Sequence, residues 1–367
     1  MTACFIRLAV NLVMNAKSLK NIAYSVLDLA TVVEGFTIAD TYHKSLENAK
    51  QAEALGYTRY WFAEHHNMIS VASSATSLLI GYIAGNTAKI RVGSGGIMLP
   101  NHSPLVIAEQ FGTLETLYPG RIDLGLGRAP GSDQTTAQAI RGQNMNAAFY
   151  FPKDVSALQQ YFSADNYDGK VRAVPGEGLG IPIWILGSST DSARLAAAKG
   201  LPYAFASHFA PAYFKEAITI YRENFVPSAQ LAHPYVMACV NVVAAETDQE
   251  ANYLASSVKQ MFMGIITDKR RLLQRPVERM EDVWSVFEEG AVMEMLAYSF
   301  IGSKKTIHNK LSAFISENGV DEIMATTHLY DHQAKLNSLE SWRRQLISLF
   351  RKLSLIHIDK LLSKLSL

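Results

Sequence analysis

The chain has 367 residues, of which 49% are hydrophobic and 18% are charged, and its formal net charge is +1. Such a chain can bury a sizeable core, and its near-neutral charge argues against a nucleic-acid or polyanion partner. No apolar run reaches the roughly 18 residues that a membrane span needs, and the two cysteines, Cys4 and Cys239, form neither a disulfide framework nor a metal-ligand motif. We therefore expect a cytoplasmic globular protein.

The two ends of the chain differ from its middle. Residues 1–21 contain a short apolar stretch, but Asn11 and Asn15 interrupt it, so an export signal is not expected. Residues 346–367 have a basic amphipathic pattern that could lie on a membrane or against a partner. We expect instead a terminal helix packed on its own domain, or a tail outside the functional unit. The functional domain is therefore placed at residues 22–345.

Within this domain, short apolar segments rich in β-branched residues alternate with helical segments. The helix expected after the first strand ends at Gly56, and the helix expected after the third begins at Pro104 and ends before Gly120. Strands are expected at residues 22–30, 58–66, 89–99, 121–127, 181–187, 201–207, 233–245 and 320–328.

Strands that alternate with helices imply a parallel sheet. We predict an α/β fold, a closed (β/α)8 TIM barrel, with insertions after strand 4 (residues 128–152) and after strand 7 (residues 264–300) that cover one barrel face. An open doubly wound sheet is the alternative, but no GxGxxG motif follows the first strand, which argues against its dinucleotide-binding version. No linker divides the domain.

In such a barrel the active site lies at the carboxyl ends of the strands, around the opening that we call the barrel mouth. Polar or glycine-rich residues follow the first six expected strands, and because these strand ends converge, we expect a site there. The residues are Asp28; Glu64, His65 and His66; residues 93–96 with Asn101 and His102; residues 125–133; residues 187–193; and Ser207 with His208. Candidates for lining a substrate pocket are Tyr24, Phe62, Ile97, Phe205 and His208.

The run Glu64-His65-His66 could be a metal site, an acid–base site or a polar strand end. Zinc sites use three or four ligands with characteristic spacing, and adjacent residues on an extended strand point to opposite sides. Only one of the two histidines can then face the mouth, so no metal site is expected. A single histidine acting as an acid or base fits better, although an ordinary hydrogen-bonded histidine would give the same pattern.

Two further segments suit a phosphorylated ring. From Gly187 through Ser188 and Ser189, a strand ends and a helix begins, and the exposed N–H groups and dipole of such a turn can bind phosphate. Ordinary N-capping by serine is the alternative. Arg128 and Arg141 could add the charge that a phosphate prefers, or could be solvated surface residues.

The consecutive glycines Gly95 and Gly96 lie near a strand end. Glycines there mark close backbone approach or unusual torsions. A flat ring lying against bare backbone would need these features, and a simple β-bulge is the alternative.

Three segments in this order resemble the bacterial luciferase-like monooxygenase family of flavin-dependent (β/α)8 proteins, in particular its single-component, non-luminescent bacterial members. They are WFAEHHNM (61–68), RVGSGGIMLPNHSPLVIAEQFGTLETLYPGRIDLGLGRAPG (91–131) and PIWILGSSTDSARLAAAKGLPYAFAS (182–207). The resemblance covers residues 22–345 and leaves both ends outside the family pattern.

The resemblance implies that reduced FMN, or less commonly the deazaflavin F420, binds in the mouth. His65 matches a histidine of flavin–oxygen chemistry, with Glu64 or another neighbour orienting it. Gly95 and Gly96 match a non-proline cis peptide beneath the flavin ring. For the phosphate, Arg128 matches a binding arginine, Arg141 matches more weakly, and Ser188 and Ser189 fall in the binding turn after Gly187.

The function implied is oxygenation of a small organic substrate by O2 through a C4a-peroxyflavin. A separate flavin reductase would supply reduced FMN, because the chain has no nicotinamide fingerprint, and the insertion at 264–300 would exclude water. Light-emitting members carry a reactive cysteine where this chain has Gly127, so light emission is not expected. F420-dependent hydride transfer and non-catalytic flavin binding remain alternatives. We expect a homodimer through the early helices, and no metal, nucleic-acid or membrane partner.

Overall fold

The computed structural model describes residues 22–142, 144 and 146–343. The expected N-terminal extension at 1–21 and the expected tail at 346–367 therefore lie outside the described residues. Among the residues described, no helix is long and apolar enough to cross a membrane.

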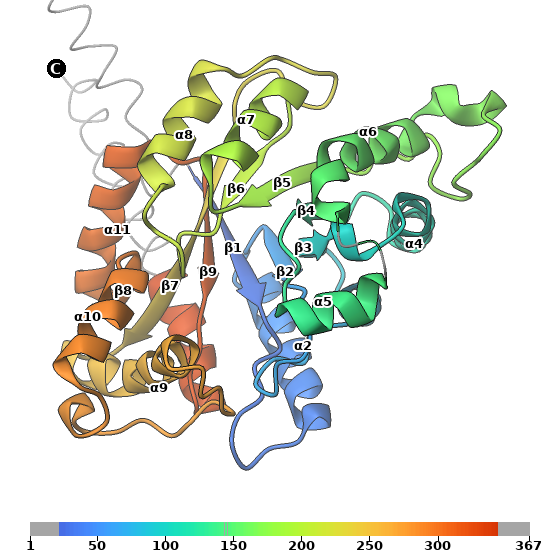
Figure 1. Cartoon of the computed structure of the whole chain (residues 1–367). Helices are drawn as coiled ribbons and strands as arrows, with labels where there is room; N and C mark the ends of the chain where they lie inside the picture. Colours follow the sequence, from blue (N-terminus) through green and yellow to red (C-terminus); the bar gives the residue numbers. More distant parts are fainter. Residues whose placement is uncertain (1–21, 143, 145, 344–367) are drawn as a thin grey trace, which may run out of the picture.

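Eight parallel strands close into a barrel that is surrounded by helices (Figure 1), which confirms the predicted fold. The strands follow one another around the ring from β1 to β7, and β9 then pairs with both β7 and β1. The bounds are β1 Ala23–Asp28, β2 Arg59–Phe62, β3 Arg91–Met98, β4 Ile122–Gly127, β5 Ile183–Gly187, β6 Tyr203–Phe205, β7 Val236–Ala245 and β9 Glu322–Thr326.

The second strand is shorter than predicted, because β2 ends at Phe62 and the Glu64-His65-His66 run lies in the loop beyond it. A further strand, β8 (Ser299–Ser303), pairs with the second half of β7 outside the ring and was not predicted.

Helices follow the strands as the sequence indicates. Pro104 is the first residue of α4, and Gly56 and Gly120 take positive φ angles of +72° and +76° just past the ends of α2 and α4. The helices are α2 Ile38–Ala54, α3 Thr76–Gly85, α4 Pro104–Leu117, α5 Gln134–Arg141, α6 Phe151–Phe162, α7 Thr190–Lys199, α8 Phe214–Glu223, α9 Asp248–Ile266, α10 Val286–Met295 and α11 Lys304–Asn318. Short 3-10 helices are η1 Leu99–Asn101, η2 Ala147–Tyr150, η3 Ala164–Asp168 and η4 Met280–Asp282.

Both predicted insertions contain structure of their own. Residues 128–152 hold α5 and η2, and residues 264–300 hold the end of α9, η4, α10 and the first residues of β8. The second insertion docks beside the loop after β1, where the Leu273 N–H donates to the Val32 carbonyl at 2.9 Å and the Glu34 N–H donates to the Leu273 carbonyl at 3.0 Å. This insertion therefore reaches the carboxyl end of the barrel.

Side chains alternate between the barrel interior and the layer under the helices, as the period of two for a strand requires. Leu27, Trp61, Met237 and Met324, from four strands, pack together in the interior. Tyr24, Phe62, Ile97 and Phe205 instead pack in the outer layer with helix residues; Phe205, for example, contacts Phe214 of α8 at a ring distance of 5.3 Å. The pocket-lining role predicted for these four residues is therefore wrong.

A buried charge network fills the amino-terminal end of the barrel. The Arg59 guanidinium bridges Asp123 at 2.7 Å and Glu322 at 3.1 Å, and Arg91 contacts Asp123 at 2.6 Å. The Tyr235 hydroxyl donates to Glu322 at 2.9 Å. Both carboxylates have no exposed surface, so they depend on these partners to replace water. The network joins β2, β3, β4 and β9 across the barrel.

We expect Arg59→Ala to lower the free energy of unfolding by about 3–5 kcal/mol, because it removes the guanidinium that two buried carboxylates share. Urea denaturation measures the loss. The control is Arg279→Ala, which removes an exposed arginine near Glu281 and Asp282 and should cost about 1 kcal/mol or less. Equal losses in the two variants would show that the network does not stabilise the barrel.

Candidate active site

Three histidines from different strand ends meet near the barrel mouth: His65 after β2, His208 after β6 and His328 after β9. Burial, and to a smaller extent the nearby rings of His328 and His65, lower the pKa of His208 to about 3. Burial also lowers the pKa of His328 to about 3 and lowers the pKa of His65. All three imidazoles are therefore neutral at pH 7. Among the described residues, no group of three or more His, Cys, Asp and Glu side chains is placed to hold a metal ion.

His65 continues the inward-facing series of Trp61 and Ala63. Its Nδ1 lies 3.3 Å from the carbonyl oxygen of Gly131. Because a carbonyl only accepts hydrogen bonds, this contact assigns the proton of the neutral ring to Nδ1 and leaves Nε2 as an acceptor. The neighbour that orients His65 is thus Gly131, in the segment after β4, and not Glu64.

The carboxylate of Glu64 lies at the centre of a buried polar cluster, the Glu64 cluster. His66 Nε2 lies 2.8 Å from Oε1, and His102 Nε2 lies 3.0 Å from both carboxylate oxygens. The Met98 N–H donates to Oε2 at 3.0 Å, and the Asn101 side chain donates to Oε1 at 3.1 Å. The carboxylate therefore links the end of β2 to the end of β3 and to the loop that follows it.

The ionisation of Glu64 follows from these contacts. Burial alone would raise its pKa, but the hydrogen bonds from His102 and His66 and from the Met98 N–H outweigh burial and lower the pKa to about 2. Glu64 holds no proton at neutral pH. Its geometry suits a role in holding its neighbours, and not one as a proton donor.

Arg141 belongs to the margin of the Glu64 cluster. Its Nε donates to the Asn101 side-chain oxygen at 2.9 Å, and its buried Nη2 has no hydrogen-bond partner among the described residues. Asn101 also donates to the Pro130 carbonyl at 2.9 Å. The structure thus joins Arg141, Asn101 and Pro130, and shows no contact between Arg141 and the turn that was expected to bind phosphate.

That turn lies between β5 and α7. A Cβ at Gly187 would lie 2.2 Å from the Ser192 hydroxyl oxygen, so only glycine fits there. Ser189 occupies the N-cap position, but its side chain makes no capping hydrogen bond, and the first backbone N–H groups of α7 are left for a ligand. Arg128 Nη2 lies 3.4 Å from the Asp191 carboxylate in the first turn of α7. The structure therefore brings Arg128 to this turn.

The peptide bond between Gly95 and Gly96 is cis, as the resemblance implied, and the pairing of β3 with β4 shifts register between Gly95 and Ile97. A Cβ at Gly95 would lie 2.7 Å from Leu27, and one at Gly96 would lie 2.8 Å from the Gly125 carbonyl oxygen. Side chains are therefore excluded at both positions, and bare backbone is presented at this strand end.

Met98 occupies the space beside Gly127, its pairing partner on β4. A Cβ at Gly127 would lie 2.7 Å from the Met98 sulfur. Where the light-emitting members are expected to have a thiol, this chain therefore places a thioether from the neighbouring strand.

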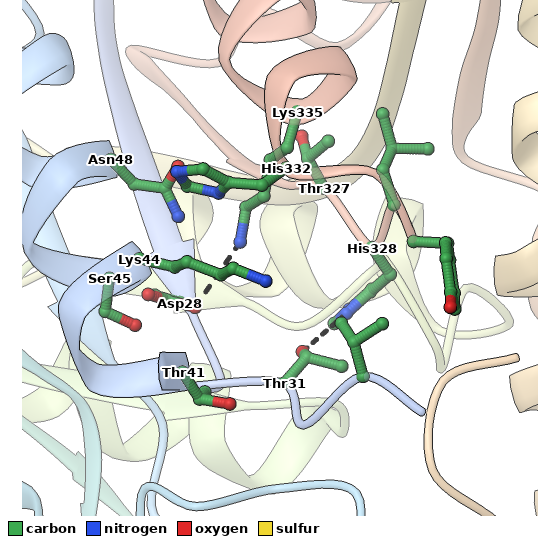
Figure 2. Close-up of a pocket in the computed structure, with 13 residues that line it drawn as sticks. Asp28, Thr31, Thr41, Lys44, Ser45, Asn48, Thr327, His328, His332 and Lys335 are labelled. Atoms are coloured by element: carbon green, nitrogen blue, oxygen red, sulfur yellow. Dashed lines mark hydrogen bonds and ion pairs between the residues drawn. The ribbon is translucent and has the colours of Figure 1, made fainter. Parts of the chain in front are cut away.

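Asp28 does not face the barrel mouth, although it is the last residue of β1. It lines a pocket between β1 and α2, where its carboxylate lies 3.7 Å from the Lys335 ammonium (Figure 2). Burial would raise the pKa of Asp28, but Lys335 and hydrogen bonds from Ser45 and Tyr60 lower it. His328 closes the far side of this pocket and contacts Thr31 at 3.0 Å (Figure 2).

Sequence reasoning named His208 as a strand-end residue and as a candidate for lining the pocket, without a specific role, and it missed Asn241 and His328. Taking every second residue along β7 and β9, starting from those that face the interior, would have identified Asn241 and His328. Met237 and Cys239 face the interior of β7, so Asn241 follows on the same side. Asn241 is also the pairing partner of Thr326 on β9.

The chain is similar to known proteins over most of its length. The family model described as "Luciferase-like monooxygenase" matches residues 24–322. A "Luciferase-like monooxygenase" of Escherichia coli strain K12 is 50% identical over 321 residues, which cover 88% of this chain and 96% of the relative. An "N-acetyl-S-alkylcysteine monooxygenase" of Bacillus subtilis strain 168 is 37% identical over 236 residues, which cover 63% of this chain and 70% of the relative.

Solved structures share the fold. Apo-MsnO8 is 33% identical with a TM-score of 0.79, and the match covers 88% of this chain and 98% of that one. The oxygenating constituent of 3,6-diketocamphane monooxygenase from Pseudomonas putida, in complex with FMN, is 18% identical with a TM-score of 0.67, covering 87% and 96%. An F420-dependent secondary alcohol dehydrogenase is 13% identical with a TM-score of 0.62, covering 88% and 98%.

The Glu64 cluster predicts a pH-dependent stability. The pKa of Glu64 is about 2 in the folded chain against an ordinary value of 4.5, so its contribution is fully present above pH 4.5 and is lost as the pH falls toward 2. We expect the stability advantage of the wild type over Glu64→Gln to shrink by about 3 kcal/mol across this interval. Urea unfolding at several pH values measures it.

The control for this prediction is Glu223→Gln, at the exposed end of α8. It should show no such pH-dependent difference from the wild type. A difference between wild type and Glu64→Gln that stays constant with pH would contradict the proposed ionisation of Glu64.

Proposed function

The chain belongs to the luciferase-like monooxygenase family, and on that premise we propose that it is an FMN-dependent monooxygenase. It takes reduced FMN from a separate flavin reductase and uses O2 to oxygenate a small organic substrate. The observation that carries the proposal is the approach of Arg128 to the uncapped first turn of α7, at the same barrel end as the bare backbone of Gly95 and Gly96.

The residues of the mouth fit a phosphorylated flavin. Arg128 and the α7 turn, with Gly187, Ser188 and Ser189, would bind the phosphate, because N–H groups and the helix dipole favour an anion there. The exposed ion pair between Arg128 and Asp191 contributes about 1 kcal/mol at most, so Arg128 can exchange this partner for a phosphate. The backbone at Gly95 and Gly96 would lie under the ring.

The remaining residues of the site hold the loops of the mouth in place and orient the groups that react there. Reduced FMN, when bound, supplies the electrons that activate O2. His65 presents the Nε2 lone pair toward the mouth and can take up a proton there, since Gly131 holds Nδ1–H. The Glu64 cluster keeps the loops after β3 and β4 in place. The insertion at 264–300, which docks beside the loop after β1 through Leu273, would cover the mouth and exclude water.

F420-dependent hydride transfer is the second candidate function, because a solved F420-dependent enzyme shares the fold. The monooxygenase proposal is favoured by the name of the 50% identical relative and by that of the Bacillus subtilis enzyme. A flavin-binding role without turnover is the third candidate, in keeping with the lack of a thiol at Gly127.

We also propose a homodimer through the early helices. Leu78 and Tyr82 of α3 and Leu117 of α4 are large apolar side chains with exposed surface. Together they supply apolar area that a second copy of the chain could cover.

The first test is a titration of the chain with oxidised FMN, reduced FMN and F420. We expect reduced FMN to bind most tightly and Arg128→Ala to weaken FMN about ten- to a hundred-fold without weakening riboflavin, because a charge-assisted hydrogen bond to the phosphate is lost. Arg172→Ala, at an exposed arginine paired with Glu177, is the control. Equal losses for FMN and riboflavin would exclude the phosphate role, and tighter binding of F420 would favour hydride transfer.

For His65→Ala we expect FMN binding to persist, while the absorbance of oxidised flavin returns faster after the reduced complex is mixed with O2. The reason is that the variant lacks the imidazole that can take up and release a proton at this site. Stopped-flow spectroscopy measures the rate, with His233→Ala, at an exposed histidine, as the control. An unchanged rate in His65→Ala would remove His65 from the chemistry.

A further inference from the structure

A basic segment, Lys269-Arg270-Arg271, lies in the insertion after β7 and is held near the barrel mouth. Its backbone packs on the end of α9, where the Lys269 N–H donates to the Gly264 carbonyl at 2.9 Å. Two residues later, Leu273 pairs as a parallel bridge with Val33 after β1. Figure 1 shows this part of the chain, in orange, at the barrel end to which the strand arrows point.

The three basic side chains of this segment do not face the same way. Lys269 and Arg271 line a cavity between α9 and α10 that also contains Glu288, whereas Arg270 does not line it. Arg270, which does not line this cavity, lies on the side of His65. Burial has the largest effect on the pKa of His65 and lowers it, and the positive charge of Arg270 lowers it further.

Arg270 is an exposed guanidinium, and no carboxylate in the described part of the chain forms an ion pair with it. Glu288 lies in the cavity on the other side of the segment, where its negative charge faces Lys269 and Arg271. A planar guanidinium matches the two oxygens of a carboxylate. At the mouth, Arg270 therefore offers a place for the anionic end of a ligand.

Deeper in the mouth, two buried polar atoms have no partner among the described residues: His208 Nδ1 and Asn241 Oδ1. The two side chains are only 9% and 2% exposed. They are tied together, since the Asn241 side-chain amide donates to the His208 carbonyl at 2.6 Å. Buried polar atoms normally have partners, and a ligand with a neutral amide or hydroxyl group could supply them.

We propose that the substrate is a small organic carboxylate with a neutral polar group. Arg270 binds the carboxylate at the entrance, and His208 with Asn241 binds the neutral group beside His65. This assignment rests on the proposed function for its reaction, but its binding chemistry is tested separately. It makes Arg270 a specificity-determining residue outside the flavin phosphate site, which uses Arg128.

The test uses two probes of nearly equal shape, N-acetylglycine and its uncharged analogue N-acetylglycinamide, titrated calorimetrically into the full chain with FMN present. We expect the wild type to prefer the carboxylate. Arg270→Ala should weaken N-acetylglycine by about ten-fold or more and leave N-acetylglycinamide unchanged, because only the first presents a charge to the guanidinium. The preference should also fall as salt is raised.

Arg271→Ala is the matched control, because it removes the same charge from the next residue, which faces away from the mouth. It should change neither affinity. Asn241→Leu should weaken both probes, with the unfolding temperature reporting whether the variant folds, and His208→Phe gives a second measurement of the same subsite. Retained binding of both probes in these two variants would overturn the role of the neutral subsite.

Equal binding of the two probes by the wild type, binding of neither, or an equal loss in Arg271→Ala would overturn the carboxylate assignment. An FMN titration of the same samples keeps the two proposals apart. Loss of FMN binding with a retained preference for N-acetylglycine would refute the proposed function and leave the anion site. Tight FMN binding without a preference for N-acetylglycine would refute the anion site and leave the proposed function standing.

Discussion

The geometry of the site depends on one buried carboxylate, that of Glu64. An ionised carboxylate without solvent contact must have its oxygens saturated by donors, and here the donors come from the loop after β2, from the end of β3 and from the loop before α4. Asn101 extends the arrangement to the Pro130 carbonyl. The next residue, Gly131, holds the ring of His65. The loops of the mouth are therefore placed relative to one another by a carboxylate that is ionised at neutral pH.

The two ends of the barrel use buried polar groups differently. At the amino-terminal end, Arg59, Asp123 and Glu322 satisfy one another and join strands across the ring. At the carboxyl end, His208 Nδ1 and Asn241 Oδ1 are buried and have no partner in the described part of the chain. A saturated network stabilises a fold, whereas unsatisfied atoms in a cleft are available to a ligand. The carboxyl end thus combines a saturated network, the Glu64 cluster, with buried atoms that a ligand could satisfy.

The barrel alone does not determine the chemistry, because related barrels bind FMN in one solved structure and serve an F420-dependent enzyme in another. Two features of this chain lie beside the strand ends of the mouth. Met98 fills the space beside Gly127, and Arg270 comes from the insertion after β7. We propose that the strand ends bind a phosphorylated ring and that the insertion after β7 selects what binds beside it.

The sequence by itself determined the barrel, the two insertions and the glycines at 95, 96 and 187, because alternating apolar patterns and glycine requirements are local properties. It also indicated that one histidine of the pair faces the mouth. Only the tertiary structure decided that Glu64 binds His66 and His102 and not His65, that Asp28 faces α2, and that four predicted pocket residues lie in the outer layer. Hydrogen-bond partners, burial and pKa values depend on strands and loops far apart in the chain, and no local pattern contains them.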